Sequence, residues 1–357
     1  MGQENHGPAL LFYGRASWPT TVSTANVSFA EPSGGTDGSF GRTFAVGNFD
    51  GSGGSDLVIG RPFYPDFIAS PHGRGYLFFS PFTAYETTAD LIVAPLNDTK
   101  GHFGVSMASG RIDSDTKDDL LVGETTVTAG TNTYGRISLF KGSSLTGSGT
   151  KVPDKTIIHL TSGSQFGSAV SVGRLNGDTY SDVLVGAPAL ASNNGAAYIF
   201  LAKSDGSGLD TNQSASVTLS SQTSLEKFGS SVLIGDAFGD GTNDVVVGAE
   251  AYSALTGRVY VFNDPLSDQT VDETLTGQTG EKFGHALAGG RKANDPTFLL
   301  LIGGPAWDDI GQGEIDAGRI TVASIPEFAD VGFVGGLTIV VLLLVRRRRL
   351  AAQTRVP

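Results

Sequence analysis

Apolar and small residues recur along the chain in a fixed order that begins, five times, with a Phe-Gly pair. A short strand of small residues follows each pair, then an acidic turn, then an apolar strand that ends in Gly: DLVIG, DLLVG, DVLVG, DVVVG and LLLIG. The pairs are Phe40-Gly41, Phe103-Gly104, Phe166-Gly167, Phe228-Gly229 and Phe283-Gly284. They start 63, 63, 62 and 55 residues apart, which indicates an internal repeat.

A third strand follows in all five repeats, and a fourth strand follows in the first four. A Gly-led aromatic strand comes third, as in residues 195–200, and a more polar strand comes fourth, as in residues 217–219. Four short strands per unit of roughly 60 residues are typical of a β-propeller blade. The uninterrupted apolar second strand fits a position that neighbouring blades cover on both faces. We therefore predict an all-β fold, with a propeller of four-stranded blades over residues 9–324.

The two ends of the repeat array are incomplete. Residues 9–14 match a third strand and residues 22–30 a fourth, but no Phe-Gly half precedes them, and the last copy lacks a fourth strand. Either the N-terminal fourth strand closes the last blade, giving five blades and an orphan third strand, or six or seven blades existed whose first halves are missing. Residues 1–8 are expected to be unstructured and carry no secretory signal, so we expect the true N-terminus to lie upstream.

The C-terminal residues follow a different pattern. Residues 331–345 are apolar throughout, and four arginines, 346–349, come directly after them. This arrangement predicts one transmembrane helix, preceded by a linker over residues 325–330, with the basic tail 346–357 in the cytosol and the propeller outside. The net charge of −12 then divides into +3 for residues 325–357 (five Arg against Glu327 and Asp330) and −15 for the remainder.

Composition and motifs restrict the classes of function. The absence of Cys excludes a disulfide scaffold, a thiolate metal site and a Cys nucleophile, and the negative charge argues against a nucleic-acid partner. The chain has no GxSxG, P-loop or HExxH motif, and its five His are scattered. These features predict that the protein is not an enzyme. Sequons at Asn26, Asn97 and Asn212 fit surface glycosylation of an exported protein.

The first acidic turn carries the strongest pattern for a metal. Asn48, Asp50, Ser52 and Asp56 place oxygen side chains at positions 1, 3, 5 and 9, with Gly53 at position 6. Calcium binds six to eight such oxygens, so these residues are predicted to hold it. The alternative is a plain Gly- and Asp-rich β-turn.

The other turns match this pattern less well. The fourth keeps Asp236, Asp240 and Asp244 but has Phe238 at position 3. For this turn the sequence favours a calcium site and a plain β-turn equally. The second and third begin with Arg111 and Arg174, whose guanidinium groups we expect to pair with the turn carboxylates and so replace part of the charge of a cation. The second turn carries Asp113, Asp115 and Asp119, and the third carries Asn176, Asp178 and Asp182. In the fifth copy, Arg291, Ala293, Asp295 and Leu299 leave no site.

Two segments resemble known families. Residues 166–188, which run from Phe-Gly through an acidic loop to DVLVGAP, resemble the FG-GAP repeats of the integrin α-subunit propeller. This resemblance implies calcium in the acidic turns. Ile325-Pro326-Glu327-Phe328, followed by an apolar run and arginines, resembles the archaeal PEF-type C-terminal sorting signal. That second resemblance implies processing by a sortase-like enzyme and anchoring at the cell surface.

Together these features lead to one expected function and two alternatives. We expect a non-catalytic, calcium-stabilised propeller that is anchored at the cell surface and acts in adhesion or ligand binding, with an extracellular protein or glycan as its partner. One alternative is a carbohydrate-binding, lectin-like propeller. The other is an accessory domain of a larger surface enzyme, the rest of which was lost by truncation.

Overall fold

The computed structural model describes residues 8–12, 25–32, 39–63, 72–96, 101–129, 131–210, 214–221, 223–291, 298–306 and 318–323. These residues form short strands, together with one 3-10 turn and two four-residue helical turns, α1 (Leu190–Asn193) and α2 (Tyr252–Leu255). The linker 325–330, the predicted membrane helix 331–345 and the tail 346–357 lie outside the described residues. No helix within the described residues has the length and apolar character to cross a membrane.

The strands form six sheets. The first contains β1 (Ala9–Leu11), β2 (Val27–Phe29) and β6 (Tyr85–Glu86). The second contains β3 (Thr43–Gly47), β4 (Asp56–Arg61), β5 (Arg74–Phe78), β7 (Leu91–Val93) and β11 (Gly149–Lys151). The third contains β8 (Ser106–Gly110), β9 (Asp119–Ala129), β10 (Asn132–Phe140) and β12 (Lys155–His159). The fourth contains β13 (Ala169–Gly173), β14 (Asp182–Ala187), β15 (Ala196–Phe200) and β16 (Val217–Ser220). The fifth contains β17 (Phe228–Gly235), β18 (Asp244–Ala249), β19 (Arg258–Phe262) and β20 (Glu273–Thr276). The sixth contains β21 (Ala286–Arg291), β22 (Phe298–Gly304) and β23 (Arg319–Ala323).

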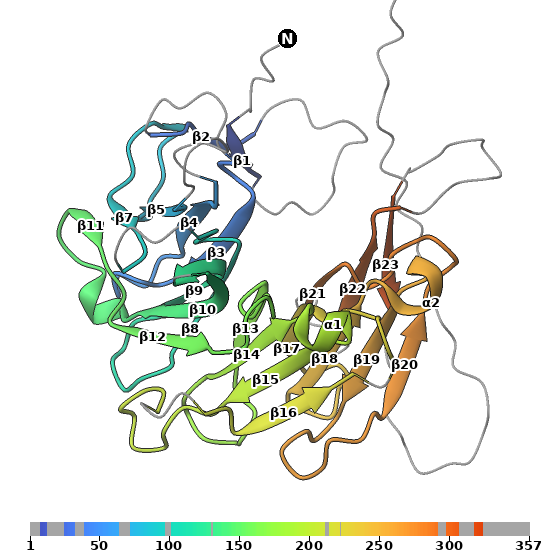
Figure 1. Ribbon diagram of the computed structural model, residues 1–357. Helices are drawn as coiled ribbons and strands as arrows, with labels where there is room; N and C mark the ends of the chain where they lie inside the picture. The colour runs from blue at the N-terminus through green and yellow to red at the C-terminus, as the bar shows by residue number, and fades with distance from the viewer. Residues whose placement is uncertain are drawn as a thin grey trace, which may run out of the picture.

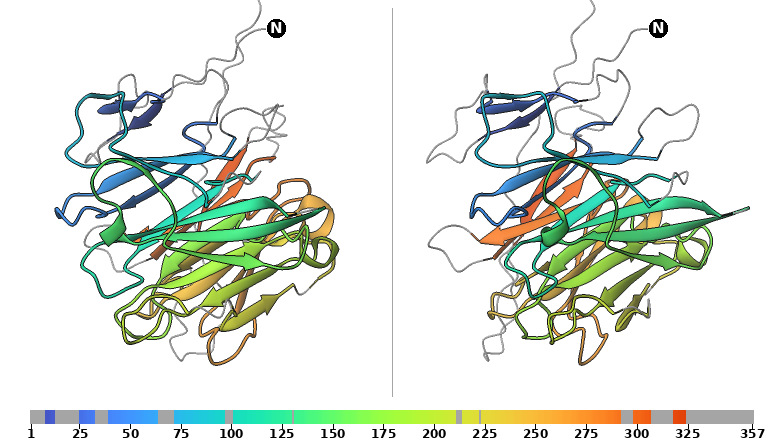
Figure 2. Two further views of the ribbon diagram at one scale, coloured as in Figure 1. Left: turned by 60° about the vertical axis from the view of Figure 1, so that its left-hand side comes forward. Right: turned by 90° about the vertical axis from the view of Figure 1, so that its left-hand side faces the viewer.

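The sheets succeed one another in chain order, from the blue N-terminal sheets through green to the orange C-terminal sheet (Figures 1 and 2). The first strands of consecutive repeats, β3, β8, β13, β17 and β21, lie side by side. This is an all-β propeller, as the repeat predicts, and its six sheets are six blades. The second strands β4, β14 and β18 are buried along their whole length, which confirms that sheets cover them on both faces.

The pairing of the N-terminal strands decides between the two alternatives for the number of blades. Within the described residues, β1 pairs with β2, and β2 pairs in parallel with β6, which comes from the following repeat. Neither strand joins β21, β22 or β23. The idea that the N-terminal fourth strand closes the last blade is therefore wrong, and the partial repeat forms a sheet of its own.

Strand β11 repeats the arrangement of β6, which the sequence pattern did not predict. Both strands come from the connection between the third and fourth strands of one repeat, and both pair in parallel with the fourth strand of the preceding sheet. They cover the outer edges of β2 and β7. An edge strand exposes unpaired N–H and C=O groups, so this crossover satisfies them from the next repeat.

Four of the five Phe-Gly pairs, those that begin at Phe103, Phe166, Phe228 and Phe283, lie against two glycines of the preceding sheet. One glycine is in the second strand and the other begins the third strand; we call the space between them the Phe-Gly socket. A Cβ atom on the second-strand glycine Gly248 would lie 2.1 Å from the carbonyl oxygen of Gly284, and one on Gly257 would lie 2.2 Å from that of Phe283. Such distances are below any real Cβ contact, so the sockets require glycine.

Hydrogen bonds fix the pairs in these sockets. The N–H of Gly284, a residue at φ +82°, donates to the carbonyl of Gly303 in its own sheet at 3.1 Å. In three repeats a hydroxyl two residues after the Phe-Gly pair donates to the Phe-Gly glycine of the next repeat. These hydroxyls belong to Thr43, Ser106 and Ser231, at 2.6, 2.7 and 2.6 Å. The Phe rings at positions 103, 166, 228 and 283 are all buried.

The helical turns α1 and α2 also hold the next Phe-Gly pair. Ala254 in α2 has a φ of +56°, a left-handed conformation that costs on the order of 1 kcal/mol for a residue with a Cβ. The turn brings the carbonyl oxygens of Leu255 and Thr256 to the N–H groups of Lys282 and Phe283, at 2.7 and 3.2 Å. The docking of the following repeat therefore offsets the local strain.

Substitution of Gly248 by Ala is expected to lower the free energy of unfolding by about 2–3 kcal/mol, because the new methyl group overlaps the Gly284 carbonyl oxygen. Urea unfolding followed by circular dichroism measures the change. Gly290→Ala is the matched control, since no described atom lies within 4 Å of its added Cβ; it should change stability by less than about 0.5 kcal/mol. Equal stabilities of the two variants would contradict the close contact.

Candidate functional site

Four acidic turns join the first and second strands of the second to fifth sheets. In each, the last aspartate begins the second strand and is buried: Asp56, Asp119, Asp182 and Asp244. One carboxylate oxygen of each accepts a backbone N–H from the start of its turn, from Phe49, Ile112, Leu175 and Phe238, respectively. These carboxylates therefore fix the fold of the turn whether or not a cation is bound.

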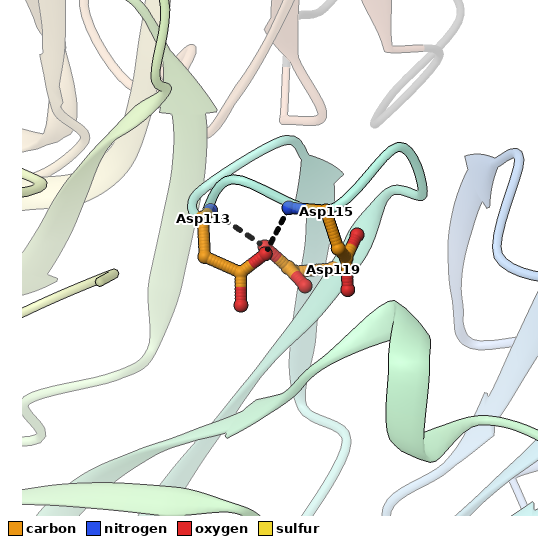
Figure 3. Close-up of side chains that lie close together, drawn as sticks. All are labelled: Asp113, Asp115 and Asp119. Carbon is orange, nitrogen blue, oxygen red and sulfur yellow. Dashed lines mark hydrogen bonds between the residues drawn. The ribbon is translucent and has the colours of Figure 1, made fainter. Parts of the chain in front are cut away.

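The second turn gathers three carboxylates. Asp113, Asp115 and Asp119 each place an oxygen within 4.8 Å of the others, and Asp113 and Asp119 are buried (Figure 3). The N–H of Asp113 donates to Asp119 Oδ2 at 3.2 Å, and the N–H of Asp115 donates to Asp113 Oδ1 at 3.0 Å. Three converging carboxylates form the type of donor set that calcium binds.

An ammonium group lies against this cluster. Lys141 Nζ is 2.9 Å from Asp113 Oδ2, and this hydrogen bond raises the pKa of Lys141. The expected role of Arg111 is wrong, because its guanidinium donates to the backbone carbonyl of Asp115 and not to a carboxylate. Burial raises the pKa of Asp119 to about 7, against the opposing effect of the N–H that Gly142 donates. The ionised form of Asp119 is thus costly unless positive charge is close by.

The sequence pattern missed Lys141 because this residue is far from the acidic turn in the chain. It directly follows the third strand β10, where the other repeats have Phe79, Leu201 and Asn263. A comparison of this one position between the copies could have singled it out. The contact itself depends on the third strand ending beside the turn, which the spacing of residues does not show.

The first turn, which carried the strongest sequence pattern, is closed by its own backbone. Asn48 Oδ1 accepts the N–H of Gly53 at 3.2 Å, Asp50 Oδ1 that of Ser52 at 2.7 Å, and Ser52 Oγ that of Gly54 at 3.3 Å. These bonds are typical of a plain polar turn. The second turn contains bonds of the same kind, from the N–H of Asp115 to Asp113 Oδ1 at 3.0 Å and from the N–H of Lys117 to Asp115 Oδ1 at 2.8 Å, and it differs from the first in gathering three carboxylates.

The third turn also uses its side chains internally. Asn176 Nδ2 donates to Asp178 Oδ2 at 3.0 Å, and Asp178 Oδ1 accepts the N–H of Tyr180 at 2.8 Å. Burial raises the pKa of Asp182. The Arg174 side chain forms no ion pair within the part of the chain that the structure describes, so the expectation that it pairs with these carboxylates is wrong.

The fourth turn contains a buried oxygen without a donor. In the first three turns, the second carboxylate oxygen of the last aspartate accepts an N–H at 2.9 Å, from Ser80, Gly142 and Ala202. The corresponding oxygen of Asp244, Oδ1, is buried and has no hydrogen-bond partner among the described residues. Burial raises the pKa of Asp244 to about 7.

The rest of the fourth turn is only partly suited to a cation. Asp236 Oδ2 accepts the N–H of Gly241 at 3.1 Å, and Asp240 accepts that of Thr242 at 2.8 Å. Phe238, at the third position, is buried as an apolar residue and offers no oxygen. The unmatched oxygen of Asp244 fits a hard cation, whereas the three aspartates do not converge as those of the second turn do. Most of the fifth turn lies outside the described residues.

Replacing Lys141 with Met should lower the free energy of unfolding by about 1 kcal/mol in the presence of a chelator. The reason is that the Asp113 carboxylate loses its ammonium partner, and the contribution is small because the Lys141 side chain is partly exposed. Added calcium should recover this loss. Lys203→Met is the control, since the Lys203–Asp210 pair is exposed at 3.6 Å. Denaturant unfolding measures both variants; a Lys141 variant as stable as the control in chelator would show that the ammonium group does not stabilise the cluster.

Comparison with known proteins identifies the repeat. Residues 166–200 match the FG-GAP repeat family. Integrin alpha-5 of Xenopus laevis is 29% identical over 224 residues, which cover 57% of this chain and 20% of that protein. Phosphatidylinositol-glycan-specific phospholipase D of Rattus norvegicus is 32% identical over 236 residues, which cover 58% of this chain and 27% of that protein.

A solved structure, that of the Dos1 propeller, aligns with a TM-score of 0.42 and 14% identity over 76% of this chain and 52% of that one. This chain spans about a fifth to a quarter of the length of the integrin and phospholipase relatives. One of its repeats, residues 166–200, matches the FG-GAP repeat family, and the chain is similar to integrin alpha-5 over 57% of its own length.

Proposed function

We propose that this chain is a non-catalytic adhesion or ligand-binding module, stabilised by calcium and displayed at the cell surface through its C-terminal segment. The observation that carries the proposal is that the strands repeat from sheet to sheet, whereas the loops that join the second and third strands differ. The second and third strands extend into a long hairpin in the third sheet, β9 to β10, but are joined by the short turns α1 and α2 in the fourth and fifth sheets. Binding residues concentrate on such variable loops of a fixed scaffold.

Calcium is assigned to the second and fourth turns. Asp113, Asp115 and Asp119 would hold it in the second, in place of Lys141, and Asp244 would use its unmatched Oδ1 in the fourth. Bound calcium would supply positive charge to carboxylates whose pKa burial has raised to about 7 at Asp119 and Asp244. The positive charge of the ion would keep the Asp119 and Asp244 carboxylates ionised.

Surface display is supported by the likeness to integrins and by the apolar run and arginines at residues 331–349, which resemble a sorting signal and anchor. The non-catalytic assignment rests on how the polar groups are used. Ser164 Oγ lies 3.3 Å from His159 Nδ1, a pairing that could suggest a nucleophile and a base. Yet Ser164 is 1% exposed and its hydroxyl also accepts the N–H of Phe166, so it is not presented to a substrate.

Calcium at a hundredfold excess over its Kd should raise the free energy of unfolding by about 2.7 kcal/mol relative to chelator for each site that binds it. Asp119→Asn and Asp244→Asn should each remove part of this gain. Asp268→Asn, an exposed aspartate of another turn, should leave the gain unchanged and serves as the control. Differential scanning calorimetry in calcium and in chelator gives the comparison. Identical transitions in both solutions would end the calcium assignment.

The ligand-binding role requires a separate test. The immobilised chain should retain at least one member of a panel of extracellular proteins and glycans, and retention should weaken when a chelator is added. A chain that retains no member of the panel would argue against an adhesion module. The calcium measurement is independent of this result, because it concerns the stability of the turns.

A pocket between the third and fourth sheets favours carbohydrate binding as a second candidate function. It has a volume of about 300 Å³, and its lining includes His159, Phe166, Tyr198 and Thr218. The His159 ring stacks on Phe166 at 5.3 Å and lies 5.0 Å from Tyr198. Burial lowers the pKa of His159, which keeps the imidazole neutral at pH 7. Neutral aromatic faces beside hydroxyl groups suit a small, uncharged polyhydroxyl ligand.

If this pocket binds sugar, His159→Ala should weaken the binding at least about tenfold by removing the stacked ring and a hydrogen-bonding nitrogen. A glycan array followed by calorimetry with the best ligand measures the change. The neighbouring Leu160→Ala is the matched control, because Leu160 is 80% exposed and does not line the pocket. No retained glycan, or equal affinities of both variants, would remove this candidate.

A further inference from the structure

The Phe-Gly socket recurs in five consecutive sheets, and four of these sockets are filled in the same way. A Cβ on the second-strand glycine would lie 2.9, 2.0, 2.0 and 2.1 Å from the carbonyl oxygen of the following Phe-Gly glycine, at Gly60, Gly123, Gly186 and Gly248. A Cβ on the glycine that begins the third strand would lie 2.0–2.2 Å from the backbone of the following Phe, at Gly73, Gly135, Gly195 and Gly257.

Among the described residues, nothing fills the fifth socket, in the last sheet, on the side where the next pair would lie. A Cβ on Gly303 would meet its nearest described neighbour, Ala286 Cβ of the same sheet, at 3.4 Å. A Cβ on Gly318 would meet the carbonyl oxygen of Pro305 at 3.5 Å. The part of the chain that the structure describes thus places no atom where the other four sockets contain a Phe-Gly pair.

A hollow occupies this position. It has a volume of about 250 Å³, and its lining includes Ala286, Gly303, Pro305, Gly318 and Ile320. The apolar surface continues along the same sheet, where Leu301 and Ile320 are 37% and 38% exposed. Strand β22 alternates between buried and more exposed residues, unlike β4, β14 and β18, which are buried throughout. One face of the last sheet is therefore uncovered by the described residues.

Charges at the rim are already compensated. Arg319 Nε and a terminal guanidinium nitrogen bond both carboxylate oxygens of Glu281, at 2.9 and 2.7 Å. His285 Nδ1 lies 2.6 Å from Glu250 Oε2. A neutral occupant therefore suits the hollow better than a charged one, because burying a further charge there would leave it without a partner.

We propose that the fifth Phe-Gly socket binds a β-hairpin of another polypeptide that presents an aromatic–glycine pair. The chemistry of the occupant is read from the four filled sockets, where a Phe ring and a glycine carbonyl lie between the same two glycines. The hairpin would also cover Leu301 and Ile320, as the following sheet covers the second strand elsewhere. The proposal is independent of calcium and of any ligand at the loops.

The socket of the fourth sheet is the closest internal template. The hydroxyl that bonds the incoming glycine elsewhere is absent there, since Ala169 stands at that position, and Ala286 is its counterpart in the last sheet. Phe228 and Gly229 fill that template without the hydroxyl, with 2.0 Å between the Gly229 carbonyl oxygen and a Cβ placed on Gly186. A synthetic peptide of residues 225–250, the hairpin that carries this pair, is therefore the probe of choice.

The test titrates this peptide into the isotopically labelled full chain and follows the backbone amides by NMR. We expect saturable shifts at His285, Gly303 and Ile320, and at least about tenfold weaker binding when the peptide carries Phe228→Ala. The chain variant Gly303→Ala should lose binding by a similar factor, because its methyl group would overlap the incoming carbonyl as in the filled sockets. Its unfolding midpoint should equal that of the unmodified chain, whereas Gly248→Ala is destabilised.

Several results would overturn the proposal. Absence of saturable shifts, or equal affinity of the peptide for the Gly303→Ala chain, would show that the socket does not accept the hairpin. Destabilisation of Gly303→Ala to the extent of Gly248→Ala would show that the chain fills the socket itself. Self-association of the unmodified chain that Gly303→Ala abolishes, measured by analytical ultracentrifugation, would instead support the proposal and identify the other polypeptide as a second copy of this chain.

Discussion

The close approach of two backbones between consecutive sheets is the contact on which the rest of the structure depends. Gly123 and Gly167, for example, come so near that a single added carbon would lie 2.0 Å from a carbonyl oxygen. Because this distance admits no side chain, each repeat must place glycine at the same points of its second and third strands. The buried Phe of the pair then lies beside its own third strand, as Phe166 does with Phe200 at 6.1 Å. The strained left-handed turns α1 and α2 persist because this docking uses their carbonyl groups.

This constraint explains why the architecture could be predicted from the sequence. Glycine spacing and apolar runs are imposed by backbone contact and burial, both of which leave a trace at fixed positions of every copy. The crossover strands β6 and β11 left no such trace, because they are short, polar and held by backbone hydrogen bonds that many residues can form. The number of blades was open for the same reason: the pairing of β1 with β2 depends on which strands meet in space, and each strand alone fits either arrangement.

The acidic turns show why a metal site could be predicted only in part from the sequence. The last aspartate of each turn is needed to bind backbone N–H groups, so its presence follows from the fold and does not by itself indicate a metal. The turns differ in which group, if any, pairs with their remaining carboxylate oxygens. All four turns direct side chains to their own backbone; in addition, the second takes up the ammonium of Lys141, and the fourth leaves Asp244 Oδ1 without a partner among the described residues. The contact of Lys141 and the donor that is absent at Asp244 both depend on residues outside the turn, which the nine-residue pattern does not include.

Repetition also determines what happens where the described sheets end. An inner sheet is stable because both faces are covered by sheets of the same kind, and every socket is closed by the repeat that follows. The last sheet has the same glycines at Gly303 and Gly318 and the same apolar strand, but its uncovered face exposes Leu301 and Ile320. Toward the other end, the second sheet leaves Phe44 and Val46 of β3 49% and 58% exposed. Burying such residues contributes on the order of 25 cal/mol for each Å² of apolar surface, so both ends favour contact with a further sheet. The sequence of a repeat thus encodes an interface as well as a fold, and the terminal copies present that interface to whatever polypeptide can match it.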